Sequence, residues 1–183
     1  SAAGVVLEQG DQPSANAICL VTPLGEDASS VIARKRLPPQ RSLALETFVG
    51  FDTRRVLMRP PALDALVLDQ ACQALGVDGV PVEVINDSPG FIAQRVLAGI
   101  VNLGCEIAQR RIAEPATLDR AVQLALGYPH GPLGFGDHYG ALQIQQILHQ
   151  LHELYQDPRY RVSPWLRRRV QLGLPLTTPE DPA

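Results

Sequence analysis

Five arginines near the end of this chain have the side chains and spacing to bind a phosphate group. Arg159 and Arg161 precede the run Arg167–Arg169, and the guanidinium fork matches the geometry of phosphate oxygens. The same residues also fit a plainer pattern, a solvated helix with basic residues in its last turn. The sequence leaves both interpretations open.

Histidines provide a second chemical possibility, a metal site. His149, His152 and Glu153 share one face of a predicted helix, at a spacing that suits metal ligation. That face lies opposite the apolar stripe of the helix, where polar residues are expected in any case. Because no further ligand cluster accompanies them, we expect no metal site here. His130 and His138 are interpreted as surface or lining residues.

Two long phrases stand out between these groups. Each combines turn residues with polar residues at fixed places, and a polar side chain next to a rigid turn is easily held in one position. The first phrase, 86–95, reads Asn86-Asp87-Ser88-Pro89-Gly90-Phe91-Ile92-Ala93-Gln94-Arg95. The second, 127–140, contains Gly127, Pro129, Gly131, Pro132, Asp137 and Gly140. We expect Asp137 to cap or bond a nearby backbone amide rather than act as a general base.

The composition limits the classes of partner that this chain can bind. The chain has 183 residues, is 45% hydrophobic and 19% charged, and carries a net charge of −3. This is globular composition without a bulk electrostatic basis for binding nucleic acid. No apolar run has membrane-spanning length, and no signal peptide pattern is present. We therefore expect neither a nucleic-acid partner nor a membrane partner.

The three cysteines and the first residue bear on where the chain comes from. Cys19, Cys72 and Cys105 are scattered and lack metal spacing, so they are interpreted as reduced thiols of a cytoplasmic protein. The chain starts at Ser1 and has one methionine, Met58. We interpret it as a segment of a longer protein.

Residues 1–86 show alternating strand and helix patterns, which predict a small α/β layer with a parallel sheet. Helices are expected at 26–36 and 63–75. Strands are expected at 17–21, 42–45, 55–58 and 80–85, with a further short strand at 5–7.

Residues 87–173 predict helices instead, and 174–183 a flexible tail. Over 91–112, winding at 3.6 residues per turn puts Gln94 and Asn102 on a polar side. Val96, Ile100 and Leu103 fall on an apolar side wider than half the circle, which fits either a central core helix or a core helix that also feeds an interface. Further helices are expected at 115–126, 132–155 with a break near Gly140, and 164–172.

In their order and spacing, the two phrases resemble the C-terminal domain of the 3-hydroxyacyl-CoA dehydrogenase family. The resemblance covers about residues 80–172. It implies a truncated Rossmann-like parallel sheet followed by a helical domain of the 6-phosphogluconate dehydrogenase C-terminal type. It also implies that Pro89, Gly90 and Phe91, together with the turn residues of the second phrase, are structural.

The resemblance places Gln94 where the family has an asparagine that approaches the substrate. Glutamine moves the amide by roughly 1 Å, enough to cost large factors in rate, so we do not expect Gln94 to be catalytic. As candidates for contact with an acyl-CoA substrate the resemblance suggests Gln94, Arg95, Arg167 and Arg168.

Other groups that the family uses are missing from this sequence. Its enzymes bind NAD through a glycine-rich loop, and they use a histidine oriented by a glutamate. No such loop occurs here, and no histidine precedes Asp87. The pattern resembles the degenerate second repeat of long family members, so the segment alone is expected to bind no cofactor and to be inactive.

The parent protein would then be an NAD-dependent oxidoreductase of fatty-acid or aromatic-acid catabolism. The implied partners are the catalytic NAD-binding domain of the same polypeptide, an acyl-CoA substrate and a second copy paired through the helical domain. The alternative is a free-standing non-catalytic interaction or acyl-CoA-binding module. A remote third possibility is another dehydrogenase with a similar helical domain.

Overall fold

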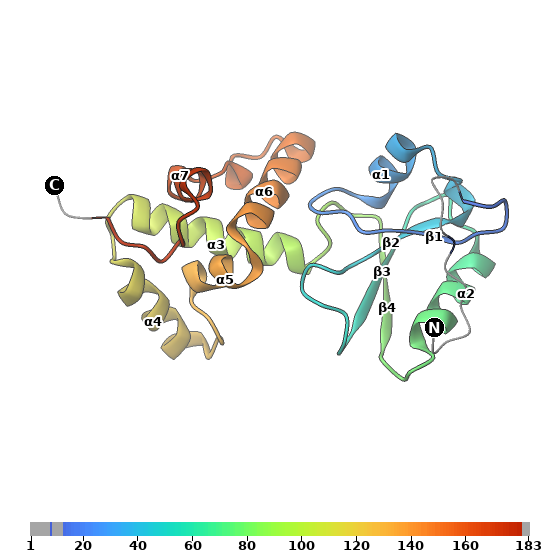
Figure 1. Ribbon diagram of the computed structural model, residues 1–183, viewed down its shortest axis with the longest axis horizontal. Coiled ribbons are helices and arrows are strands. Elements are labelled where there is room, and N and C mark those ends of the chain that lie inside the picture. Colours follow the sequence, from blue (N-terminus) through green and yellow to red (C-terminus); the bar gives the residue numbers. More distant parts are fainter. Residues whose placement is uncertain (1–7, 9–12, 181–183) are drawn as a thin grey trace. The chain divides into compact units, whose positions relative to one another are not determined.

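The computed structural model describes residue 8 and residues 13–180, which form two compact units. An α/β unit extends to Phe91, and a helical unit begins at Ile92 (Figure 1). The change from α/β to all-α structure was predicted, whereas the boundary was placed earlier, between residues 86 and 87. The strand predicted at 5–7 lies outside the described residues.

The sheet of the α/β unit has four strands in the order β1-β2-β3-β4. These are β1 (Cys19–Val21), β2 (Ser42–Leu45), β3 (Arg55–Arg59) and β4 (Val82–Asn86). β1 pairs with β2 and β3 with β4 in parallel, but β2 and β3 are antiparallel. The sheet is therefore mixed, and the prediction of a parallel sheet was wrong for its centre. The connection 46–54 contains no helix, and a parallel crossover would need a dozen residues or more.

One helix covers each face of this sheet. α1 (Ala28–Lys35) packs on Ala44 and Met58, while α2 (Ala65–Gly76) packs on Leu43 and Leu57. Neighbouring strand residues thus point to opposite faces, as the period of a β-strand requires. A short 3-10 helix, η1 (Pro39–Arg41), leads into β2.

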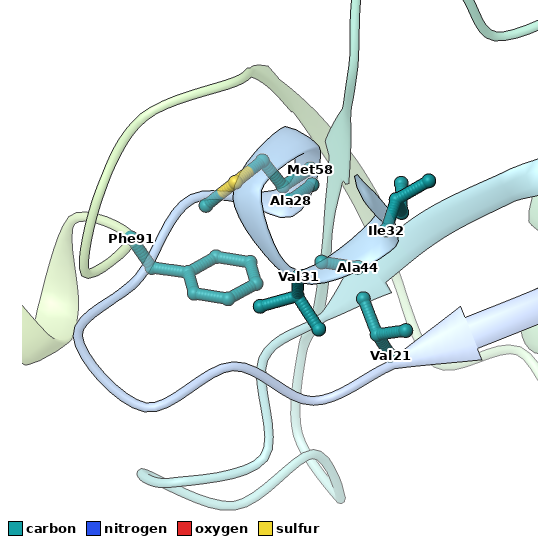
Figure 2. Packing of buried hydrophobic residues seen from close by; sticks show 7 residues of the cluster. All are labelled: Val21, Ala28, Val31, Ile32, Ala44, Met58 and Phe91. Atoms are coloured by element: carbon teal, nitrogen blue, oxygen red, sulfur yellow. The ribbon is translucent and has the colours of Figure 1, made fainter. Parts of the chain in front are cut away.

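Phe91 closes the α/β unit. Its side chain is buried with Val31, Met58 and Ala28 beneath α1 (Figure 2). The turn before it uses left-handed backbone at Gly90 (φ +70°) and at Phe91 itself (φ +43°), which is rare for a bulky residue. Gly90 thus permits the tight turn between β4 and α3. Pro89 precedes this turn, and α3 begins at Ala93.

The helical unit is built around α3 (Ala93–Gln109), which contacts α4 (Pro115–Leu126), α5 (Pro132–Tyr139), α6 (Ala141–Tyr155) and α7 (Pro164–Leu172). The 3-10 helix η2 (Pro158–Tyr160) lies between α6 and α7. The predicted break at Gly140 separates α5 from α6. Ser163 caps α7, because its hydroxyl accepts a hydrogen bond from the Trp165 amide at 3.3 Å.

α3 does not bury the side that its sequence suggests. Gln94 and Asn102, predicted on the polar side, are 1% and 5% exposed, whereas Val96 and Leu103 are 54% and 63% exposed. The side facing the other helices is lined by small residues, among them Ala98 and Cys105. Small side chains let α5, α6 and α7 approach α3 closely, so the bulkier residues remain on the outside.

Residues 174–180 are anchored to the helical unit through the buried Leu176, whereas a flexible tail was predicted for that stretch. Leu176 is fully buried, and its carbonyl accepts a hydrogen bond from Trp165 Nε1 at 2.9 Å. Arg169 Nη2 donates to the carbonyl of Thr178 at 2.7 Å. We call residues 174–180 the C-terminal strap. The prediction for residues 181–183 lies outside the described residues.

Candidate functional site

The four residues predicted to contact acyl-CoA do not meet in one site. Gln94 is buried in the first turn of α3, and Arg95 beside it is partly exposed. Arg168 Nη2 donates to Gln109 Oε1 at 2.7 Å, at the opposite end of α3. With 1.5 Å of rise per residue, Gln94 and Gln109 lie about 22 Å apart.

The basic run on α7 is largely occupied within the fold. Arg168 also pairs with Glu180 at 3.2 Å. Arg169 is 4% exposed and stacks on Trp165, with its Cζ 3.1 Å from the ring centroid. Burial lowers the pKa of Arg169, and the charge of Glu180 opposes that shift. Arg167 is exposed and remains accessible to an anion.

The second phrase serves packing. A Cβ at Gly131 would overlap Asp119, and one at Gly136 would overlap Leu176. Asp119 accepts hydrogen bonds from the amides of Leu133 at 2.9 Å and Gly134 at 2.7 Å, which caps α5. The sequence analysis missed Asp119, because it lies outside the phrase and its partners are 14 and 15 residues away.

Asp137 bonds backbone amides, as predicted, but distant ones. Its carboxylate accepts from the Leu176 amide at 2.6 Å and from Thr177 at 3.2 Å (amide) and 2.8 Å (hydroxyl). Gly127 ends α4 in left-handed backbone, and Pro132 occupies the first turn of α5. Gly140, at φ +99°, separates α5 from α6. Pro129 accepts a hydrogen bond from Gln123 Nε2 at 3.1 Å.

The helix N-termini of the α/β unit do not fit the pyrophosphate of NAD. Asp87 accepts hydrogen bonds from the amides of Ala28 at 2.7 Å and Ser29 at 3.0 Å, and Asp27 accepts from the amide of Ser30 at 2.6 Å. Carboxylates thus occupy the amides at the start of α1 that an anion would need. α2 follows Pro60 and Pro61 and is capped by Asp64, whose Oδ1 accepts from Leu66 at 3.0 Å.

Histidine and cysteine contacts give no metal-binding group among the residues that the structure describes. No three His, Cys, Asp or Glu side chains converge there. His152 Nδ1 lies 3.2 Å from the Asp157 carbonyl, while His130 and His138 stack with ring centroids 4.5 Å apart. All three cysteines are free, and burial raises the pKa of Cys105 to about 12. Within the described part of the chain, no helix is long and apolar enough to cross a membrane.

A groove along α3 is a feature that the sequence analysis missed. It lies between residues 95–110 of α3 and the segment 158–161, and it encloses about 700 Å³. We call it the α3 groove. Arg95 is the one predicted substrate-contacting residue that lines it. Val96, Ile100 and Leu103 recur at helical spacing in the sequence and could have indicated this groove. The sequence analysis instead placed them on the same apolar side as the residues expected in the core.

The helical unit matches a known family. Residues 90–180 match the family model for the 3-hydroxyacyl-CoA dehydrogenase, C-terminal domain. The helical unit is a 3-hydroxyacyl-CoA dehydrogenase C-terminal domain. A probable 3-hydroxybutyryl-CoA dehydrogenase of Deinococcus radiodurans is 37% identical over 89 residues, which are 49% of this chain and 32% of that protein.

A curated Escherichia coli relative and an Escherichia coli crystal structure extend the likeness. The 3-hydroxyadipyl-CoA dehydrogenase is 34% identical over 103 residues, covering 56% of this chain and 22% of that protein. The crystal structure of a 3-hydroxybutyryl-CoA dehydrogenase superposes with a TM-score of 0.74 at 27% identity. That superposition covers 84% of this chain, so it includes part of the α/β unit, and 31% of the other chain. The matches thus span about a fifth to a third of these relatives.

Proposed function

We propose that this chain is the C-terminal segment of an NAD-dependent 3-hydroxyacyl-CoA dehydrogenase, and that it packs against a catalytic unit without catalysing the reaction itself. The observation that carries the proposal is the contrast within the chain. The helical unit matches the family domain, whereas carboxylates fill the helix N-termini of the α/β unit. The longer protein would oxidise a 3-hydroxyacyl-CoA to the 3-oxoacyl-CoA.

The chemistry of that reaction supports an inactive segment. Removing hydride from a 3-hydroxyl carbon requires a base near the hydroxyl proton. Residues 1–129 contain no histidine, and the four histidines all lie in the helical unit. Among the described residues, none of these histidines contacts a carboxylate that would orient it, and Gln94 lacks a group that accepts protons at neutral pH.

Contact with acyl-CoA is proposed for Arg95 and Arg167 alone. These two guanidiniums make no ion pair with a described residue, while Arg168 is paired with Glu180. Arg95 lies on α3 close to Gln94, where the family's asparagine approaches the substrate. We therefore propose that Arg95 completes the acyl-CoA site of the parent enzyme, in a cytoplasmic protein.

Binding and activity measurements test this function. Isothermal titration of residues 1–183 with NADH should show no binding with a Kd in the micromolar range. Addition of NAD and 3-hydroxybutyryl-CoA should produce no NADH. Micromolar binding or steady turnover would contradict the proposal. A glycine-rich loop and a His–Glu pair upstream in the same reading frame would favour it over a free-standing module.

Self-pairing through the helical unit is part of the same proposal. Val96 and Leu103 on α3 are more than half exposed. We propose that a second copy covers this apolar side of α3, because a two-fold axis brings identical patches together. Sedimentation should show a dimer for the unmodified chain and a monomer for Leu103→Ser, while Leu142→Ser on α6 should remain dimeric. A monomeric unmodified chain would contradict this contact.

A further inference from the structure

The sheet of the α/β unit has an outer edge at β1. Among the described residues β1 pairs with β2 alone. Along a β-strand, alternate residues direct their backbone amides and carbonyls toward opposite neighbours, so part of the backbone of Cys19–Val21 faces away from β2. An edge strand with such unpaired groups is a template for pairing with another chain. We call this side of the strand the β1 edge.

The two edges of the sheet differ in charge. β4, at the other edge, carries Glu83, which pairs with Arg54 at 3.1 Å. Charged side chains on an edge strand are a common protection against pairing. β1 carries no charged residue, and its Leu20 is 43% exposed although the register partner Leu43 is fully buried. β1 is therefore the edge that is open to a further strand.

A pocket of about 260 Å³ adjoins the β1 edge on the side of α1. It is lined by two residues of β1, by the residues that follow the strand and by one side of α1, among them Leu20, Val21, Leu24, Val31, Arg34 and Lys35. A strand paired with β1 would direct alternate side chains to the two faces of the sheet. Those on the side of α1 would lie over this pocket, and those on the side of α2 would cover Leu20.

The α1 side of the pocket offers a positive charge. Arg34 pairs with Glu26 at 2.7 Å, so its charge is largely matched within the fold. Lys35, the next residue, is exposed and makes no ion pair with a described residue. A carboxylate on an incoming strand would therefore find an opposite charge at this end of the pocket.

The unpaired backbone specifies a strand as the occupant, because amides and carbonyls in a row are best satisfied by another extended backbone. An identical β1 from a second copy would bring no carboxylate for Lys35. The curated relatives described above continue well beyond the stretch that they share with this chain. We propose that the β1 edge binds an extended apolar strand, with a carboxylate at the end beside Lys35, from the catalytic unit of the longer protein. The source of the strand rests on the proposed function, whereas the edge does not.

Methylated peptides test the backbone pairing. The first is a fluorescein-labelled peptide of about eight residues in which valine and threonine alternate between two terminal glutamates. Two further peptides carry N-methyl groups on one or the other set of alternate amides. Fluorescence anisotropy with residues 1–183 should show that one set is tolerated and that the other weakens binding about tenfold, since only one side of a strand can pair with β1. Lysines in place of the glutamates should also weaken binding.

Variants locate the binding surface. Leu20→Lys should abolish binding, because a charge on an edge strand opposes pairing. Val84→Lys is the matched control, since Val84 is 40% exposed on β4 at the opposite edge. Lys35→Glu should make the lysine peptide the better ligand, whereas Arg120→Glu on α4 should leave the preference unchanged. Circular dichroism reports whether each variant keeps its fold.

Hydrogen exchange tests the source of the strand. The outward-facing amides of Cys19–Val21 should exchange rapidly in residues 1–183 and slowly in the longer protein, because there the catalytic unit would pair with them. Equally rapid exchange in both proteins would contradict the catalytic unit as the source.

Several other outcomes would overturn the proposal. These are no binding of the unmethylated peptide, equal weakening by both sets of methyl groups, or unchanged binding by the folded Leu20→Lys variant. Binding that appears only in Val6→Pro would assign the edge to residues 5–7 of the same chain, and loss of a dimer in Leu20→Lys would assign it to a second copy. Turnover by residues 1–183 would contradict the proposed function but leave the peptide result unchanged.

Discussion

Carboxylates fill the helix N-termini of the α/β unit, whereas in the helical unit glycines let helices and the C-terminal strap come close together. Asp27 and Asp87 take the amides at the start of α1. Gly104, Gly131 and Gly136 lie where a Cβ would overlap a neighbour. The first arrangement retains a fold while removing a place for an anion. The second is a packing in which an added Cβ would overlap a neighbouring residue.

The largest expected effect is on packing in the helical unit. A Cβ at Gly104 would lie 2.5 Å from Pro132 Cβ, while a Cβ at Gly99 on the same helix meets nothing within 4 Å. Gly104→Ala should lower the free energy of unfolding by about 2 kcal/mol. Gly99→Ala should raise it by about 0.5–1 kcal/mol, since alanine is the better helix former. Denaturant unfolding followed by Trp165 fluorescence measures both, and equal effects would contradict the packing argument.

A smaller effect is expected at the start of α1. Asp87→Ala should destabilise the α/β unit by about 1.5 kcal/mol, because the amides of Ala28 and Ser29 lose their acceptor. Hydrogen exchange at residues 28–30 should accelerate, while Trp165 fluorescence in the helical unit should be unchanged. Asp69→Ala, at an exposed position of α2, is the control. A shift of both units together would mean that they unfold as one.

The C-terminal strap should be held less tightly when the Asp137 carboxylate is removed. Asp137→Ala removes the acceptor of the Leu176 and Thr177 amides. It should lower the free energy of unfolding by about 1 kcal/mol, because the site is partly open to water. Faster hydrogen exchange at Leu176 and Thr177 should accompany the loss. Unchanged protection of these two amides would show that Trp165 and Arg169 hold the strap without Asp137.

The smallest effect concerns pH and the α/β unit alone. The hydrogen bond from Arg55 lowers the pKa of Asp78 from its ordinary 3.8 to about 2. A lowered folded-state pKa means that the stabilisation is present above pH 3.8 and is lost as the pH falls towards 2. The difference in stability between the parent and Asp78→Asn should therefore be constant near neutral pH and shrink over this acid range. Acid titration of both proteins, monitored by circular dichroism, measures how this difference in stability depends on pH.

Local signals in the sequence predicted most helices and strands. Proline occupies the first turns of α4, α5 and α7, and glycine follows α4 and α7. These signals and the break at Gly140 depend on a few neighbouring residues, and the helices that they bound were predicted. The two phrases likewise indicated the family, because their order and spacing are linear properties. The sequence predicted the candidate site less completely than the elements. Arg95 lines the α3 groove, but Gln94, Arg167 and Arg168 do not.

Contacts between distant residues decided what the sequence by itself did not. Asn102 bonds residues 161 and 163, Asp137 bonds residues 176 and 177, and Asp87 bonds the start of α1. The sequence determined that a long helix would follow Phe91, observed as Ala93–Gln109, and that the chain would change from α/β to helical structure. Only the tertiary structure decided which side of α3 is buried, because small residues there admit three other helices and leave Val96 and Leu103 outside.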